Sequence, residues 1–361
     1  MIGTTLARYL SLRFFNTIML IFLIICGMVY VVDLVEMLRR TANRPGITVG
    51  FIALLSFFRT PTVSEQVLPF CVLFGTMAAF IDLTRRLELI VARAAGVSVW
   101  QFLLPPIAIA LFLGIASVGL LNPISAEMKQ RADLIEAQIF GRSGQSEGDT
   151  SLWIRQTSVD GQAFLHADQT ENNSTVLGGV DAYIYDKKGH FQAKIEAESG
   201  RLLPGVWRLK NAVIAAPAEQ AAEVGTYLIA SNATPERLAE TFLAPESVPF
   251  WALPRLRQET EKAGLDSTSF NLQFQTLLAR PLLLVAMVLI AAAFSLRFFR
   301  FGGIGKMVGG GLGAGFLLYL LTKMVADLGA SGLLSASVAA WSPAVVGSML
   351  GALALLHRED G

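Results

Sequence analysis

The sequence predicts an α-helical integral membrane protein with six transmembrane helices and an inserted all-β domain outside the membrane. Apolar residues make up 53% of the 361 positions and charged residues only 16%, whereas about a quarter of a soluble protein is charged. Six apolar stretches reach the ~20 residues that a helix needs to cross the hydrocarbon core of a bilayer. Between the third and the fourth lies a hydrophilic region of ordinary domain size, residues 123–268.

The first apolar stretch follows Arg8 and Arg13 and is longer than the apolar core of a secretory signal. No small-residue cleavage site follows it, so we expect an uncleaved first span. Residues 49–61 extend the second span backwards, with Pro61 and Pro69 as expected bend points. The expected spans are residues 14–35, 63–82, 100–121, 277–296, 307–326 and 336–356.

Lysine and arginine near the span ends predict the orientation, because cytoplasmic loops carry an excess of them. If both termini are in the cytoplasm, most of these basic residues lie on the cytoplasmic side of the membrane. The short outer cluster of Arg39, Arg40 and Arg44 goes against this trend. The inner residues are Arg8, Arg13, Arg85, Arg86, Arg93, Arg297, Arg300, Lys306 and Arg358.

The hydrophilic region alternates apolar and polar residues in stretches such as SLWIRQ and GQAFLHADQ, which glycine, proline and Asp-Lys-Lys-Gly interrupt. This pattern predicts consecutive antiparallel strands in a sandwich or a jelly-roll-like fold. We therefore expect three parts. Residues 1–122 hold the first three spans and a short cytosolic helix at 84–97, residues 123–268 form the periplasmic domain, and residues 269–361 hold the last three spans.

A catalytic or metal site is not expected from the motifs. His166, His190 and His357 have no second histidine or cysteine at metal-ligand spacing. The glycine-rich stretch 301–311 superficially resembles a phosphate-binding loop, but Met307 stands where serine or threonine would hold magnesium. No run of lysine and arginine indicates a nucleic-acid partner. We expect no cofactor, no metal and no enzymatic activity in this chain.

Glycines give the fifth span a smooth, small-residue face. Gly305, Gly309 and Gly313 are spaced by four positions, which places them on one side of a helix. This face either packs against another span of the same chain or slides against a helix of a partner. The sequence leaves both interpretations open.

A short polar stretch, RRLELIVARAAGVS (85–98), separates the second and third spans. Helical spacing predicts one apolar face on it, with the charged residues and Leu89 outside that face. Gly96 is expected to end this helix and Ser98 to cap the next one. Such a helix either lies on the lipid surface or docks on a cytosolic motor. The apolar face comprises Leu87, Ile90, Val91, Ala94 and Ala95, and the charged residues are Arg85, Arg86, Glu88 and Arg93.

Charged residues also cluster at the outer ends of the first and fifth spans. Charges at membrane depth are costly unless they are paired or face water or a polar ligand. One interpretation is local ion pairing, such as Glu36 with Arg40 at i, i+4. The other is a rim that binds the head group of an amphipathic lipid, with arginine matching phosphate. The residues concerned are Asp33, Glu36, Arg39, Arg40, Lys323 and Asp327.

Over essentially its whole length the chain resembles the LptF/LptG permease family of Gram-negative bacteria, which has three spans, a strand-rich periplasmic domain and three more spans. The resemblance is strongest in VLPFCVLFGTMAAFIDLTRRLELIVARAAGVS (67–98). It extends to FWALPRL (250–256), ARPL (279–282) and GFLLYLLTKM…ASVAAWSPAVVG (315–347). YVVDLVEML (30–38) resembles the LptG branch more than the LptF branch.

One departure from the family concerns a lysine that LptG relatives often carry in the first span, a few residues before the aspartate that matches Asp33. Tyr30 stands at that register here. If that lysine contacts lipid phosphate, this chain must use other cations, and Arg39 and Arg40 are the candidates.

The resemblance implies a permease subunit of an ABC transporter that extracts lipopolysaccharide from the inner membrane and passes it to a periplasmic bridge. The implied partners are an LptF-like permease, an LptB-like ATPase dimer that hydrolyses the ATP, and an LptC/LptA-like bridge. The β domain would be a jelly roll whose apolar interior accepts acyl chains. Docking on the ATPase would involve Arg85, Arg86, Glu88, Leu89 and Arg93, with Leu89 free to enter a groove. Lipid binding would involve Tyr30, Asp33, Glu36, Arg39, Arg40 and Lys323.

Two other functions stay open at the level of sequence. One is a permease half for another lipid or for a lipoprotein. The other is a non-transporting membrane scaffold that holds periplasmic partners. Accumulation of lipopolysaccharide in the inner membrane on loss of the protein would distinguish the first from the implied function, and failure to stimulate any ATPase would indicate the scaffold.

Overall fold

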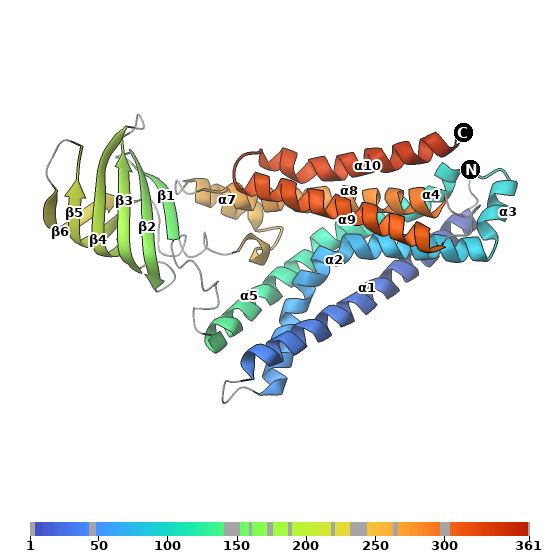
Figure 1. Ribbon diagram of the computed structural model, residues 1–361, viewed down its shortest axis with the longest axis horizontal. Coiled ribbons are helices and arrows are strands. Elements are labelled where there is room, and N and C mark those ends of the chain that lie inside the picture. The colour runs from blue at the N-terminus through green and yellow to red at the C-terminus, as the bar shows by residue number, and fades with distance from the viewer. Residues whose placement is uncertain are drawn as a thin grey trace. The chain divides into compact units, whose positions relative to one another are not determined.

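The chain forms two compact units, residues 1–132 together with 272–361, and residues 133–271. The first unit is helical and the second carries a β-sheet (Figure 1). The computed structural model describes residues 4–42, 48–140, 152–158, 161–171, 176–186, 190–217, 221–231, 244–262, 266–296 and 304–359.

Within the described residues, six helices are long and apolar enough to cross a membrane, which confirms the number of spans expected from the sequence. The backward extension of the second span is also confirmed, because one helix with Pro61 and Pro69 inside it covers the whole stretch. A π-helical segment, η1 (Ser117–Leu121), joins α4 to α5. The helices of this unit are α1 (Thr4–Thr41), α2 (Val49–Arg85), α3 (Glu88–Ala94), α4 (Val99–Ala116), α5 (Asn122–Phe140), α8 (Thr268–Ser295), α9 (Ile304–Ala330) and α10 (Ala336–Glu359).

The helical unit packs in antiparallel pairs, with α1 along α2 and α9 along α10 (Figure 1). Phe14 of α1 and Phe80 of α2 are fully buried, and their rings meet edge to face at 5.0 Å, an arrangement that aromatic pairs favour. By contrast, α1 exposes a row of large apolar side chains that includes Leu23, Ile24 and Met28. Such a surface is expected of a helix whose surroundings are lipid or another membrane helix rather than water.

The inserted domain contains one antiparallel sheet of six described strands, which confirms the predicted all-β insertion. A tight turn, Leu203–Val206, connects β4 to β5. The described strands pair in sequential order, each with its neighbour in the chain, as in a meander. They are β1 (Leu152–Ser158), β2 (Gly161–Glu171), β3 (Val176–Tyr185), β4 (Phe191–Leu203), β5 (Val206–Ala215) and β6 (Ala222–Ala230).

One face of the sheet carries the apolar core of this unit. Alternate residues such as Leu165 and Ala167 in β2, and Trp207 and Leu209 in β5, are fully buried. This is the period-two pattern that predicted the strands. After the sheet, a short 3-10 helix, η3 (Pro245–Ser247), and the polar helix α7 (Leu253–Lys262) lead to α8.

Candidate functional site

The polar stretch between α2 and α4 folds into the seven-residue helix α3. α2 ends at Arg85, and Leu87 adopts a left-handed backbone conformation with φ of 64°, which is unfavourable for a leucine. This break lets α3 start in a new direction. Gly96, with φ of 82°, follows the end of α3, and the Ser98 side chain accepts a hydrogen bond from the backbone of the first turn of α4 at 3.3 Å. Both roles were expected from the sequence.

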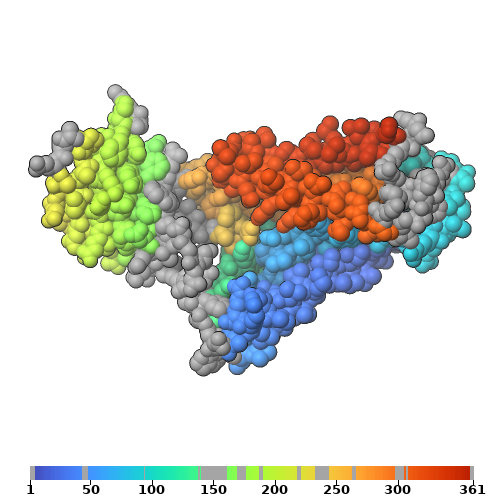
Figure 2. Space-filling view, in the orientation of Figure 1, coloured from blue at the N-terminus to red at the C-terminus, as the bar shows by residue number. Residues whose placement is uncertain are grey.

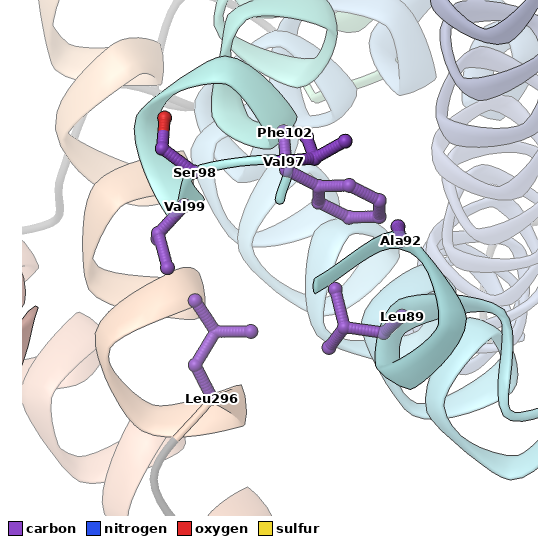
Figure 3. Close-up of a pocket in the computed structure, with 7 residues that line it drawn as sticks. All are labelled: Leu89, Ala92, Val97, Ser98, Val99, Phe102 and Leu296. Atoms are coloured by element: carbon purple, nitrogen blue, oxygen red, sulfur yellow. The ribbon is translucent and has the colours of Figure 1, made fainter. Parts of the chain in front are cut away.

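Leu89 faces the helical bundle. It is 7% exposed and lines a small pocket together with Phe102 of α4 and Leu296 at the end of α8. Figure 3 shows Leu89 pointing from α3 into this pocket, across from Leu296. A volume of about 10 Å³ leaves room for no more than one water molecule, so the pocket is packing space rather than a ligand site. The expectation that Leu89 is free to enter a partner's groove is therefore wrong. The helical wheel gives the two faces of α3 correctly, but the face that packs on the bundle is the one with Leu89.

The apolar face expected on α3 is the exposed one. Leu87, Ile90 and Val91 are all exposed, Val91 at 66%. Figure 2 shows the segment around α3 at the surface of the helical unit. The start of α1 and the end of α10 lie at this same end of the unit (Figure 1). Of the other predicted coupling residues, Arg85 is exposed, and the side chain of Arg93 lies outside the described part of the chain.

Arg13 of α1 connects the ends of three helices. Its guanidinium donates to Glu88 Oε1 of α3 at 3.2 Å and forms an ion pair with Asp82 of α2. The Tyr9 hydroxyl donates to Glu88 Oε2 at 3.1 Å, and Arg86 Nε pairs with Asp82 at 3.2 Å. Glu88 is therefore held by its own chain, and its carboxylate fixes α3 to α1.

Local ion pairing at the far end of α1 is confirmed. The Glu36 carboxylate accepts hydrogen bonds from Arg39 at 3.1 Å and from Arg40 at 2.8 Å. Both arginines are nevertheless exposed, and exposed pairs of this kind contribute little to stability. Each guanidinium can therefore exchange Glu36 for another anion at low cost. Arg44 of the same basic cluster lies outside the described residues.

Tyr30 and Asp33 face α2 rather than an open surface. The Tyr30 hydroxyl donates to a backbone carbonyl of α2 at 3.5 Å, and Asp33 Oδ1 lies 3.5 Å from Nε of Arg59, also on α2. Arg59 was not singled out from the sequence, although it is a cation in the outer part of a span. Lys323 is exposed on α9, and in the part of the chain that the structure describes it forms no ion pair with Asp327.

A buried polar cluster in the middle of the bundle was missed at the level of sequence. Glu65 of α2 forms an ion pair with Arg280 of α8. The carboxylate also accepts hydrogen bonds from Asn122 Nδ2 at 3.1 Å and Ser125 Oγ at 2.5 Å, and Arg280 lies 3.4 Å from Ser117 Oγ. The sequence could have indicated this cluster, because one acidic and one basic residue lie inside otherwise apolar spans.

This cluster lies where the helices it joins have irregular backbones. Pro61 and Pro69 flank Glu65 in α2, η1 interrupts the helix opposite, and Pro281 follows the arginine in α8. α4 and α8 also approach closely here, since a Cβ on Gly114 would lie 2.5 Å from the Cα of Pro281. The side chain of Glu65 is only 6% exposed. The polar contacts therefore hold together three helices whose own hydrogen bonding is weakened at this level.

The glycines of α9 divide between two faces. Gly311 and Gly315 face α2, because a Cβ at either would clash with α2 side chains. A Cβ on Gly305, Gly309 or Gly313 would meet no atom within 4 Å. Gly310 also packs inside the chain, because a Cβ there would clash with Phe294 of α8. The interpretation as internal packing is therefore corrected for Gly305, Gly309 and Gly313. Of the two roles considered for Gly305, Gly309 and Gly313, a contact with a partner helix stays a prediction.

The comparison with known proteins covers both the helical parts and the insertion. Residues 8–358 match the lipopolysaccharide export system permease LptF/LptG family. The lipopolysaccharide export system permease protein LptG of Escherichia coli strain K12 is 22% identical over 331 residues, 90% of each chain. The LptG protein of Haemophilus influenzae is 19% identical over 366 residues, which are 97% of this chain and 95% of that one. The chain therefore belongs to the LptF/LptG family of lipopolysaccharide export permeases, and it is a multi-pass protein of the inner membrane.

Proposed function

We propose that this chain is the transmembrane subunit of an ABC transporter that extracts lipopolysaccharide from the inner membrane and passes it to a periplasmic bridge. Membership of the permease family, six spans and an inserted β domain support the proposal. The partners would be an LptF-like permease as the second membrane half, an LptB-like ATPase dimer that hydrolyses ATP, and an LptC/LptA-like bridge that receives the lipid.

The proposal that an ATPase binds this chain rests on the exposed apolar face of α3. Leu87, Ile90 and Val91 stand at i, i+3 and i+4, the spacing with which a helix fills a groove of a protein partner. Buried Leu89 and the Arg13–Glu88 contact fix the orientation of this face. A helix of seven residues offers little area for independent binding to lipid. We infer that the ATPase docks on α3.

The basic end of α1 is suited to the head group of the cargo. Arg13 and Arg39 are about 39 Å apart along an ideal helix, close to the full thickness of a bilayer. Arg39 and Arg40 therefore lie at the membrane face opposite α3, where a lipid of the outer leaflet presents its phosphates. Guanidinium groups match phosphate with paired hydrogen bonds, and exposed Lys323 adds a further cation.

The topology that we propose places both termini and α3 in the cytoplasm and the β domain in the periplasm. The insertion follows the third span, an odd number, so it lies across the membrane from the start of α1 and the end of α10. The excess of basic residues at the α3 end supports a cytoplasmic assignment for that end. Cargo would then leave the membrane on the side of the β domain, towards the bridge.

Depletion of the chain in cells tests the cargo. Because acyl methylenes are each stabilised by ~0.8 kcal/mol in the bilayer, lipopolysaccharide does not leave without a transporter. We expect newly made lipopolysaccharide to accumulate in the inner membrane fraction while lipoproteins reach their normal membranes. Retention of lipoproteins with normal lipopolysaccharide export would indicate a different cargo, and normal distribution of both would indicate a scaffold. A plasmid copy of the chain is the control and should restore export.

A further inference from the structure

The turn before α7 carries an aromatic pair, of which Phe250 is partly buried and Trp251 is exposed. Trp251 is 68% exposed, more than Trp207, which is fully buried in the β-sheet. Its ring meets that of Phe250 edge to face at 5.1 Å. A side chain of this size is seldom left in water without a binding partner, although one exposed ring is not by itself a site. The residues around the turn indicate which partner the Trp251 side chain contacts.

Buried neighbours and a backbone hydrogen bond hold this turn in place. Val248 is 3% exposed and Leu253 is fully buried, so the residues on both sides of the pair are anchored in the domain. The backbone N–H of Ala252 donates to the Pro249 carbonyl at 2.9 Å and closes the turn.

Hydrogen bonds connect α7 to the first turn of α8, whose length indicates where the lipid head groups lie. The 28 residues of α8 span about 42 Å, the thickness of a bilayer with both head-group layers, so its first turn lies in one of these layers. Arg257 of α7 donates to Asn271 Oδ1 in this turn at 3.1 Å. One turn deeper, Gln275 accepts from the indole of Trp341 at 3.1 Å, an arrangement typical of a membrane-interface tryptophan.

A second contact ties the same turn to another spanning helix. Ser247, directly before the turn, donates to Asp133 Oδ2 of α5 at 3.2 Å. Trp251 is six positions from Arg257, a span of roughly 9 Å where the chain is helical. The residues on both sides of the aromatic pair are therefore hydrogen-bonded to α5 and to the first turn of α8.

We propose that Phe250, Trp251 and Arg255 form a membrane-surface anchor, with the rings in the boundary between head groups and acyl chains and Arg255 directed at lipid phosphates. Arg255 stands at i+4 from Trp251 and is exposed, with Glu259 as its neighbour at 2.8 Å. Indole rings favour this layer because one end is apolar and the other donates a hydrogen bond. The anchor holds α7 on the bilayer and needs no cargo, so it goes beyond the proposed function.

Fluorescence quenching by brominated lipid tests the anchor. The full-length chain with its partner subunits would be placed in nanodiscs of phosphatidylethanolamine and phosphatidylglycerol, brominated either near the head group or near the acyl end, with no lipopolysaccharide present. We expect head-group-proximal bromine to quench the wild type more than Trp251→Phe, and the difference to disappear with bromine near the acyl end. Trp341→Phe is the matched control at the neighbouring interface position, and a circular dichroism spectrum shows that each variant is folded.

Two outcomes would overturn the anchor. If Trp251→Phe and the wild type are quenched equally by both lipids, the pair does not contact the bilayer. If the emission of Trp251 is insensitive to brominated phospholipid but shifts when lipopolysaccharide is added, the pair contacts cargo instead. Depletion of the chain reports on the cargo independently, so failure of the anchor leaves the proposed function intact.

Discussion

Replacement of Glu65 by alanine is expected to lower the free energy of unfolding by about 3–5 kcal/mol, the largest stability effect that the structure predicts. The substitution leaves Arg280 as a buried charge with no carboxylate, and it removes the acceptor of Asn122 and Ser125. Desolvation of an uncompensated charge, rather than loss of attraction, is the main cost. Unfolding of the purified chain by denaturant in detergent micelles measures it.

A surface pair provides the matched control for Glu65. Glu127 forms an i, i+4 ion pair with Arg131 at 2.5 Å on the exposed side of α5, so Glu127→Ala should cost ~1 kcal/mol or less. Combining Glu65→Leu with Arg280→Met should recover most of the lost stability, because it removes both charges together. Equal destabilisation by Glu65→Ala and Glu127→Ala would show that the cluster does not hold the bundle.

Replacement of Val91 by glutamate is expected to weaken binding of the ATPase by 2 kcal/mol or more, about 30-fold in Kd. The change puts a charge in the middle of the exposed apolar face of α3, where the proposed groove would have to desolvate it. Stability should not change, because Val91 contributes little to the core. Titration of the purified ATPase onto the permease in nanodiscs measures the affinity, and lipopolysaccharide-stimulated ATP hydrolysis should fall with it.

Leu228→Glu in β6 is the control for Val91→Glu. Leu228 is similarly exposed, at 56%, but belongs to the β domain, which the proposal places on the other side of the membrane. It should leave ATPase affinity unchanged. If Val91→Glu also leaves the affinity unchanged, α3 rests on lipid and the ATPase docks elsewhere.

The spans and the helix ends could be predicted because their causes are local in sequence. A bilayer requires ~20 apolar residues in a row, and this condition located the six spans and the long α2. Ser98 as a cap and Glu36 with Arg40 as a pair depend on residues three or four positions apart. The strands of the insertion followed from alternation between neighbours for the same reason.

Features that depend on distant residues or on one unusual backbone angle were not predictable. In the sequence, the helix of Glu65 comes before the inserted domain and the helix of Arg280 comes after it, so only the fold reveals their contact. Leu89 is buried against Phe102 of α4 and Leu296 after α8, which are distant in sequence, and no propensity predicts the left-handed Leu87 before it.

Release of lipopolysaccharide from proteoliposomes tests whether this chain forms part of an ATP-driven lipopolysaccharide exporter. The chain would be reconstituted with its LptF-like partner, the LptB-like ATPase and the LptC-like protein, and transfer of lipopolysaccharide to a soluble LptA-like acceptor would be followed after addition of ATP. We expect ATP-dependent transfer with the wild type and with Leu228→Glu, and loss of transfer with Val91→Glu. Vigorous ATP hydrolysis without transfer of lipopolysaccharide, or transfer of a lipoprotein in its place, would contradict this expectation.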